Sequence, residues 1–300
     1  VNSSGTAMWQ DNMRMKIYGI MLLLPAAALL ITFAYLPTIL TVIRSLFVPE
    51  TATQPAEFVG LENYRYLFDD PVFWQVTRNN LIYAFITIPA STGIAIVMAL
   101  IVDTRMPGRG LVRMAYFSPT ILPMIAAANI WMFFYAPQIG LFNGVLGWFG
   151  INGPNWLGDP EFALPSIIIM TIWKEAGFFM IFYLAALQTI PPELREASAL
   201  EGTNRWSHFW RVTFPLLMPT TLFVLINALI NAVRVVDHLF ILTKGGPNNA
   251  TNLLLYYVYQ SAFSFFDRPY AAAITVVILA TLGILATVQF TVVDRRTHYQ

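Results

Sequence analysis

Six long apolar segments, separated by polar stretches, dominate the sequence. Each holds the roughly 20 mostly apolar residues that a helix needs to cross a hydrocarbon core of about 30 Å. We predict transmembrane helices over Ile17–Phe47, Asn79–Val102, Leu111–Tyr135, Phe162–Leu187, Pro215–Leu242 and Tyr270–Val293. The predicted fold is therefore all-α, a polytopic membrane protein with six transmembrane helices.

The first apolar segment is longer than one span requires, and it contains Pro25 and Pro37. Because proline lacks the N–H that a helix interior needs, we expect this helix to be kinked or tilted. Its start resembles a signal peptide, but the apolar run is too long for one, so we expect it to be retained. Residues 1–16 are predicted to be a cytoplasmic tail, irregular over residues 1–13. Further along, the apolar stretch 253–266 is too short to span and predicts an interfacial or re-entrant helix.

Composition supports residence in a membrane and excludes several kinds of chemistry. Hydrophobic residues make up 57% of the 300 residues and charged residues only 11%, against about 45–50% and 25% in soluble domains. The chain has no cysteine, which excludes disulfides, zinc–thiolate sites and cysteine nucleophiles. None of its three lysines follows a glycine, so it has no P-loop for ATP. We expect no cofactor or metal in this chain and, with a net charge of +1, no nucleic-acid partner.

The distribution of basic residues predicts how the spans are oriented. If the N-terminus is cytoplasmic, the inner segments hold ten basic residues and the outer loops four, as the positive-inside rule requires. The inner residues are Arg14, Lys16, Arg105, Arg109, Arg113, Arg195, Arg205, Arg211, Arg295 and Arg296, and the outer ones are Arg65, Arg78, Lys244 and Arg268. Both termini are therefore predicted to lie in the cytoplasm.

The predicted cytoplasmic loop between the fourth and fifth spans, residues 189–215, has the pattern of two short helices. Pro192 suits a first helical turn, and Glu193 and Glu196 fall near the positive end of the first helix. Gly202 is placed to end that helix in the left-handed conformation. An amphipathic second helix follows before the next span begins.

This loop resembles the coupling motif of ABC-importer permeases, which is Glu-Ala-Ala, three residues, Gly, nine residues and Ile-x-Leu-Pro. The chain has Glu196-Ala197-Ser198, three residues, Gly202, nine residues and Val212-Thr213-Phe214-Pro215. Two outer segments, 58–64 and 243–247, also resemble carbohydrate-uptake permeases. The resemblance is to the maltose and glycerol-3-phosphate permease type, and the short C-terminal tail favours the glycerol-3-phosphate-like member.

The resemblance implies a type I ABC importer permease fold, with residues 17–293 as the permease domain and 294–300 as a cytoplasmic tail. It implies a permease subunit of an ATP-dependent importer in the bacterial plasma (inner) membrane, for a sugar, sugar derivative or glycerol-3-phosphate-like solute. The implied partners are a second homologous permease in a heterodimer, two ATPase subunits that bind ATP and Mg, an external solute-binding protein and membrane lipid. The residues implied in ATPase contact are Glu193, Glu196, Ala197, Ser198, Gly202 and Pro215.

Charged residues within a span cost about 2.5–3.5 kcal/mol to insert and are usually functional or paired. In the fifth span, Asn227, Asn231 and Arg234 recur at helical spacing, and we favour a place in the solute pathway over hydrogen bonding between helices. Asp237 and His238, further along that span, are interpreted as interfacial.

Two other polar groups within the spans have two interpretations each. Lys174 and Glu175 are adjacent in the fourth span, so they point about 100° apart and need other partners. They either line the pathway or form buried ion pairs. Asn80 and Tyr83 in the second span either line the pathway or, as we favour, bond neighbouring helices.

A secondary, ion-coupled transporter is the alternative from another functional class. It predicts inverted repeats and helices broken near the membrane midplane. No repeat is evident in the sequence, and the coupling-like loop has no counterpart in the first half. An intramembrane enzyme is disfavoured because no plausible catalytic set is present.

Overall fold

The computed structural model describes residues 3–48, 55–104, 107–200 and 202–294, where helices form the regular structure and one isolated bridge joins Phe47 to Phe58. The α-helices are α1 (Ser3–Leu30), α2 (Leu36–Arg44), α3 (Glu62–Asp69), α4 (Pro71–Asp103), α5 (Arg109–Ile121), α6 (Met124–Phe134), α7 (Leu141–Trp148), α8 (Pro160–Thr189), α9 (Pro192–Leu200), α10 (Arg205–His208), α11 (Phe214–Val233), α12 (Asp237–Leu242), α13 (Leu254–Tyr259) and α14 (Arg268–Asp294). Short π-helical segments cover Ile31–Tyr35, Phe209–Thr213 and Gln260–Ser264.

Five helical runs within the described ranges are long and apolar enough to cross a membrane. They are Tyr18–Arg44, Pro71–Asp103, Pro160–Thr189, Arg205–Leu242 and Arg268–Val288. Helices α5 and α6 meet the same criterion as a pair, but they are bent by 101°. The six apolar segments are confirmed as helical, whereas the third is not the single continuous helix that we predicted.

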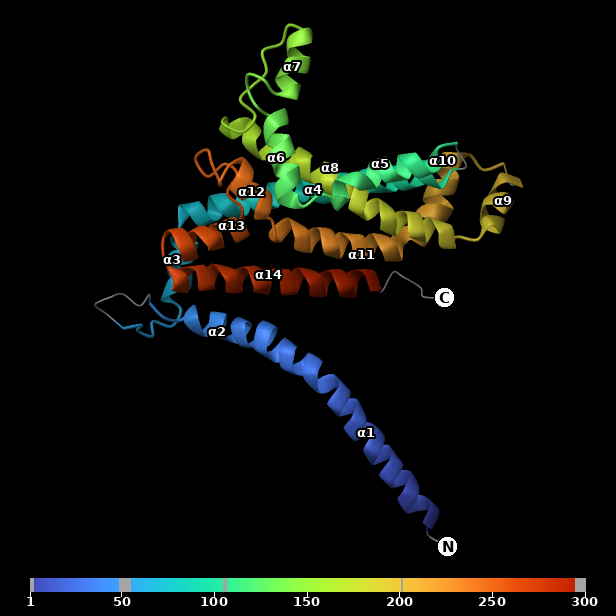
Figure 1. Cartoon of the computed structure of the whole chain (residues 1–300), viewed down its shortest axis with the longest axis vertical. Helices are drawn as coiled ribbons and strands as arrows, with labels where there is room; N and C mark the ends of the chain where they lie inside the picture. Colours follow the sequence, from blue (N-terminus) through green and yellow to red (C-terminus); the bar gives the residue numbers. More distant parts are fainter. Residues whose placement is uncertain (1–2, 49–54, 105–106, 201, 295–300) are drawn as a thin grey trace.

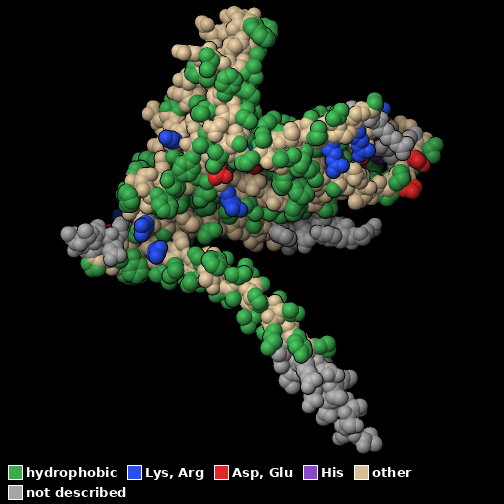
Figure 2. Space-filling view, in the orientation of Figure 1, with side chains coloured by type: hydrophobic (Ala, Val, Ile, Leu, Met, Phe, Trp, Pro, Cys, Tyr) green, Lys and Arg blue, Asp and Glu red, His purple; other side chains and the backbone are tan. Residues whose placement is uncertain are grey.

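The long helices α4, α8, α11 and α14 run side by side, with α5 packed along α8 (Figure 1). Helices α9 and α10 lie at one end of this bundle, and α3, α12 and α13 lie at the other. Hydrophobic side chains cover much of the visible long face, while acidic and basic groups gather near α9 and α10 (Figure 2). This distribution suits a bundle whose sides contact lipid and whose ends contact water.

The N-terminal helix leaves the bundle. Helix α1 continues through the π-helical segment Ile31–Tyr35 into α2, which packs on α14, and the run curves away from the other helices (Figure 1). The π-helical segment directly precedes Pro37, so the predicted distortion of this span is confirmed. The expected irregular tail is wrong over residues 3–13, which continue the helix; residues 1–2 lie outside the described residues.

Two of the predicted spans are broken at positions that the apolar pattern did not mark. Helix α5 ends before Leu122 and Pro123, which are extended. Proline has no N–H to continue the helix, and it disfavours helical conformation in the residue before it. Helix α11 ends at Val233, with Arg234 as its C-cap, and α12 begins at Asp237. The two residues after Arg234 are β-branched valines, which fit a helix less well.

The apolar core is divided along α4 and α8. One cluster joins residues 164–170 of α8 to Tyr83 of α4, to α6 and to α12. A second cluster joins residues 179–187 of α8 to residues 95–102 of α4 and to α11. The segment of α8 between them contains Lys174 and Glu175, so the polar residues of the fourth span lie where the core is interrupted.

The outer-loop end is held by hydrogen bonds between distant segments. Asp70 accepts from the hydroxyls of Tyr257 and Tyr270, both at 2.6 Å, and caps α4 at the Val72 N–H. Burial raises the pKa of Asp70, but these hydrogen bonds outweigh burial and hold the pKa below its usual value. The predicted short helix near 253–266 is α13 and the π-helical segment after it, packed on α14 and α4.

Candidate solute cavity and coupling loop

A cavity of about 370 Å³ lies beside the interrupted part of the core. It is bordered by both helix breaks and by the polar segment of α8, with Tyr83 contributed by α4. The lining residues are Tyr83, Thr120, Met124, Thr171, Lys174, Glu175, Phe178, Asn231, Arg234, Val235, Val236, Asp237 and His238. Its volume falls within the range of about 300–1,000 Å³ that is usual for small-molecule sites.

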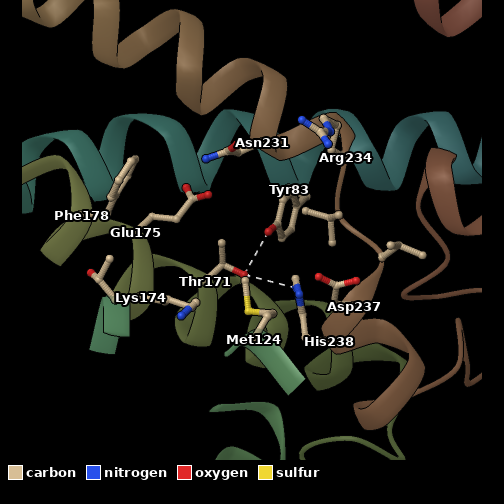
Figure 3. A pocket seen from close by; sticks show the side chains of 13 residues that line it. Tyr83, Met124, Thr171, Lys174, Glu175, Phe178, Asn231, Arg234, Asp237 and His238 are labelled. Carbon is tan, nitrogen blue, oxygen red and sulfur yellow. Dashed lines mark hydrogen bonds between the residues drawn. The ribbon is translucent and has the colours of Figure 1, made fainter. Parts of the chain in front are cut away.

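Five of the seven predicted pathway residues line this one cavity: Tyr83, Lys174, Glu175, Asn231 and Arg234. Figure 3 shows that they come from α4, from α8 and from the C-terminal end of α11. Residues 83, 174 and 231 are far apart in the sequence, so only the packing of α4, α8 and α11 brings them together. Their role in binding a solute stays a prediction at this point.

The other two predicted pathway residues do not line the cavity. The Asn80 amide donates to the carbonyl of Ala232 at 3.4 Å and accepts from the N–H of Leu254 at 3.3 Å. Asn80 is buried and bonds neighbouring segments, which is the alternative that we favoured for the second span. Asn227 donates to the carbonyl of Phe223 in its own helix at 2.7 Å and does not line this cavity, so its place in the solute pathway stays a prediction.

Lys174 and Glu175 have different surroundings although they are adjacent. The Lys174 ammonium donates to the backbone carbonyls of Pro119 at 3.0 Å and Leu122 at 2.5 Å. Glu175 instead points across the cavity towards the side-chain amide of Asn231 (Figure 3). Within the described part of the chain, neither residue forms the buried ion pair that was one of our two interpretations.

Arg234 lies at the border of the cavity, where α11 ends. Its side chain is exposed, and no polar group of the described residues pairs with it. Its backbone N–H bonds to the carbonyls of Ile230 and Asn231, which closes the last turn of α11. The guanidinium is therefore held at a fixed helix end with its donors available.

The polar residues Thr171, Asp237 and His238 line the cavity although the sequence did not predict them there. His238 is 1% exposed, and it lines the cavity together with Asp237. Their interpretation as interfacial residues stays a prediction. Thr171 receives a hydrogen bond from the Tyr83 hydroxyl at 2.9 Å and lies 3.4 Å from Nε2 of His238. Thr171 precedes Lys174 by three residues and Glu175 by four, a helical spacing that could have identified it. His238 was missed because the break before α12 changes the direction of that residue.

The predicted coupling loop forms two helices at the end of the bundle opposite α3 and α13 (Figure 1). Gly202 has a φ of +70°, as predicted for a residue that ends α9. Glu193, Glu196 and Ala197 are exposed on α9. Ser198 is half-buried, and its hydroxyl bonds to Nδ1 of His208 on α10 at 2.7 Å, which ties the two helices together.

Pro215 lies in the first turn of α11, but the π-helical segment Phe209–Thr213 continues directly into that helix. The fifth span therefore starts near α10, not at the proline. A bundle of apolar spans that encloses a polar cavity and presents two exposed short helices at one end defines a membrane transport permease.

Comparison with known proteins places the chain in a family. Residues 77–299 match the model of the binding-protein-dependent transport system inner membrane component family. The chain belongs to this family and is the permease component of an ABC importer. The family description also places it in the inner membrane and makes its transport dependent on a binding protein.

Several characterised relatives are similar over most of their length. The chain is 35% identical to the sulfoquinovosyl glycerol transport system permease protein SmoG of Agrobacterium fabrum, over 88% of this chain and 86% of that protein. It is 35% identical to the trehalose/maltose transport system permease protein MalF of Thermococcus litoralis, over 78% and 79%. It is 29% identical to the sn-glycerol-3-phosphate transport system permease protein UgpA of Agrobacterium fabrum, over 95% and 97%.

Solved structures agree with this assignment. A chain of a bacterial ABC transporter involved in the import of the acidic polysaccharide alginate superposes with a TM-score of 0.85 at 25% identity, covering 97% of this chain and all of that one. The predicted type I importer fold is confirmed. The secondary-transporter alternative gains no support, and the broken helices that it predicted occur here within an ABC permease fold.

Proposed function

We propose that this chain moves a sugar or sugar derivative through the cavity between its two broken helices. The observation that supports this most directly is the lining of the cavity. It combines carboxylates, a guanidinium, an amide and hydroxyls with the aromatic rings of Tyr83 and Phe178. A polyhydroxylated solute offers donors and acceptors to all of these polar groups and an apolar ring face to the aromatic residues.

The charge of the cavity suits more than one member of that solute class. Arg234 and Lys174 are balanced by Glu175 and Asp237, and Lys174 already binds backbone carbonyls. A neutral sugar would therefore meet a lining with no net formal charge, whereas an anionic derivative would bind mainly through Arg234, which has no partner among the described residues. The named solutes of the relatives include both kinds, a maltose-type sugar and a glycerol phosphate.

Helix α9 is the proposed contact with an ATPase subunit in the cytoplasm. Its exposed face carries Glu193 and Glu196, the small side chain of Ala197 and Leu200, which is 90% exposed. Glu196 would meet a basic group of the ATPase, and Ala197 allows a close approach. ATP and Mg would be bound by that partner, and both termini of this chain would lie on the same side.

A second homologous permease is proposed to complete the pathway. The run Tyr18–Arg44 has no buried residue in its apolar window. Leu22 and Phe33 on this run are 81% and 75% exposed. A second permease and the surrounding lipid would cover this helix. On the opposite side of the membrane, an external solute-binding protein would deliver the solute to the loops near α3 and α13.

The coupling role is tested by reversing the charge of Glu196 in the assembled importer. Glu196→Arg should lower ATP-dependent solute uptake about tenfold or more, because a like charge replaces the partner of a basic group. The matched control is Glu57→Arg, which makes the same change at an exposed position outside the helices. Uptake and membrane content are measured together. Normal uptake by a fully inserted Glu196→Arg variant would contradict the proposal.

The solute class is tested by uptake of labelled neutral and anionic sugars into vesicles that contain the importer and its binding protein. Competition among them identifies the preferred class. Failure of every polyhydroxylated compound, with normal uptake of a different class, would refute this part of the proposal.

A further inference from the structure

Lys174 has a geometry that the proposed pathway does not require. It extends from the middle of α8 to the break between α5 and α6, where its ammonium donates to the carbonyls of Pro119 and Leu122. These two acceptors flank the 101° bend. The side chain therefore bonds to the backbone of a neighbouring helix at the point where that helix changes direction.

The acceptors are groups that the break itself leaves without partners. In a continuous helix the N–H of residue 123 would bond to the carbonyl of residue 119. Residue 123 is proline, which has no N–H, so the Pro119 carbonyl has lost its helical donor. The Leu122 carbonyl follows the last turn of α5 and has no helical partner either. Within a membrane, an unsatisfied carbonyl costs several kcal/mol.

The charge of Lys174 also suits its position. The carbonyl end of a helix carries a partial negative charge, which favours a cation within its last turn. The favourable interaction of the Lys174 ammonium with this helix end, and its two hydrogen bonds to carbonyls, thus offset the free energy cost of placing a charged side chain within the span. An apolar side chain of the same length would leave both carbonyls without a donor.

Gly177 brings α5 and α8 close enough for this contact. A Cβ at position 177 would lie 2.3 Å from the backbone oxygen of Tyr116 on α5. Positions 174 and 177 are three residues apart and share one face of α8. The α5 backbone is thus held against α8 by close packing at Gly177 and by hydrogen bonds at Lys174.

We propose that Lys174 is a positioning residue, which replaces the backbone donors lost at Pro123 and thereby fixes the bend that forms one side of the solute cavity. Thr120 and Met124, on either side of the bend, both line that cavity. That the cavity binds a solute rests on the proposed function. The bend between α5 and α6 can be measured without any solute.

The bend is measured with two spin labels in the full-length chain. The sequence has no cysteine, so single cysteines can be introduced without other changes. Met114 on α5 and Met132 on α6 are exposed and suit labelling. In an uninterrupted helix these positions would be about 27 Å apart, and the bend makes the distance shorter. Lys174→Met should lengthen or broaden the distance distribution, and Lys174→Arg should keep it close to the wild type.

Uptake distinguishes positioning from solute contact. Lys174→Met should lower uptake about tenfold, since two carbonyls lose their donor, and Lys174→Arg should restore most of it. The control is Glu175→Gln, the neighbouring residue that faces the cavity, which should keep the wild-type distance whatever its effect on uptake. A fall in uptake with an unchanged distance in Lys174→Met would overturn the proposal. If the distances change as expected but no sugar is transported by the wild type, the proposed solute fails and the positioning role stands.

A double-mutant cycle covers the case in which Lys174→Met is too unstable to label. Pro123→Ala restores the N–H of residue 123, so the Pro119 carbonyl regains a donor in that background. Lys174→Met should then lower the melting temperature less than it does in the wild type. Equal losses in both backgrounds would overturn the proposal.

Discussion

The two helix breaks beside the cavity differ in how their polar groups are satisfied. At the α5–α6 break, Lys174 donates to two backbone carbonyls, and Gly177 holds the helices in close contact. At the α11–α12 break, the side chain of Arg234 is exposed and has no polar partner among the described residues. The two carbonyls at the first break are thus satisfied within the protein, while the second break offers a cation to whatever occupies the cavity.

The same contrast divides neighbouring residues on a single helix. Lys174 bonds to the backbone at the end of α5, and Glu175 points into the cavity towards Asn231 (Figure 3). Because adjacent residues of a helix point about 100° apart, one turn of α8 can serve both purposes. A charged residue within a span is therefore not sufficient evidence for contact with the solute.

The largest effect is expected from a side chain added at Gly177, because it would disrupt the contact between α5 and α8 next to the α5–α6 break. Gly177→Val places a Cβ against the Tyr116 backbone, so α5 must move away from α8. We expect a loss of about 1–3 kcal/mol in unfolding free energy, measured by thermal denaturation in detergent. Gly93→Val on α4 is the matched control, because nothing lies within 4 Å of its added Cβ. Equal stability of the two variants would show that the contact at Gly177 is unimportant.

At the α11–α12 break we expect a smaller effect on stability than at Gly177, together with a fall in solute uptake. Arg234→Gln removes a guanidinium that has no partner in the described structure, so the melting temperature should change little. Uptake should fall about tenfold if Arg234 contacts the solute. Arg65→Gln, a change of another exposed arginine outside the spans, serves as the control. A large fall in melting temperature would contradict the contrast between the two breaks.

The smallest effect is the expected difference in solute uptake between variants of two asparagines of α11, Asn227 and Asn231. Asn227→Ala removes only a hydrogen bond to the carbonyl of Phe223 in α11, so uptake should stay within about twofold of the wild type. Asn231→Ala removes the partner of Glu175 at the cavity and should have the larger effect on uptake. Both are measured as initial uptake rates at equal amounts of inserted protein. The reverse order would mean that the solute passes along the Asn227 side.

Local features of the sequence explain why some predictions were accurate. The spans that became α4, α8 and α14 are long apolar runs, whose hydrophobicity dictates helices whatever their neighbours are. Gly202 adopts the left-handed conformation because few other residues do so readily. The two short helices α9 and α10 were predictable because Pro192 and Gly202, which indicate them, lie within one short segment.

The errors concern features that depend on contacts between segments. Asn227 and Asn231 lie one turn apart in α11, yet only Asn231 lines the cavity. The break after Val233 changes the direction of the chain before His238, which lines the same cavity. The pattern of apolar residues continues through the break, so it gave no sign of the change in direction.

The sequence by itself determined that this is a helical membrane protein of the importer permease class, because hydrophobic runs and a short motif are local properties of the chain. The tertiary structure decided which polar residues meet. Lys174 became a partner of backbone carbonyls, and Glu175 and Arg234 became part of a cavity, through the packing of α5, α8 and α11. The physical reason is that a buried polar group must find its partner in space, and that partner lies more than 50 residues away for Lys174 and Glu175.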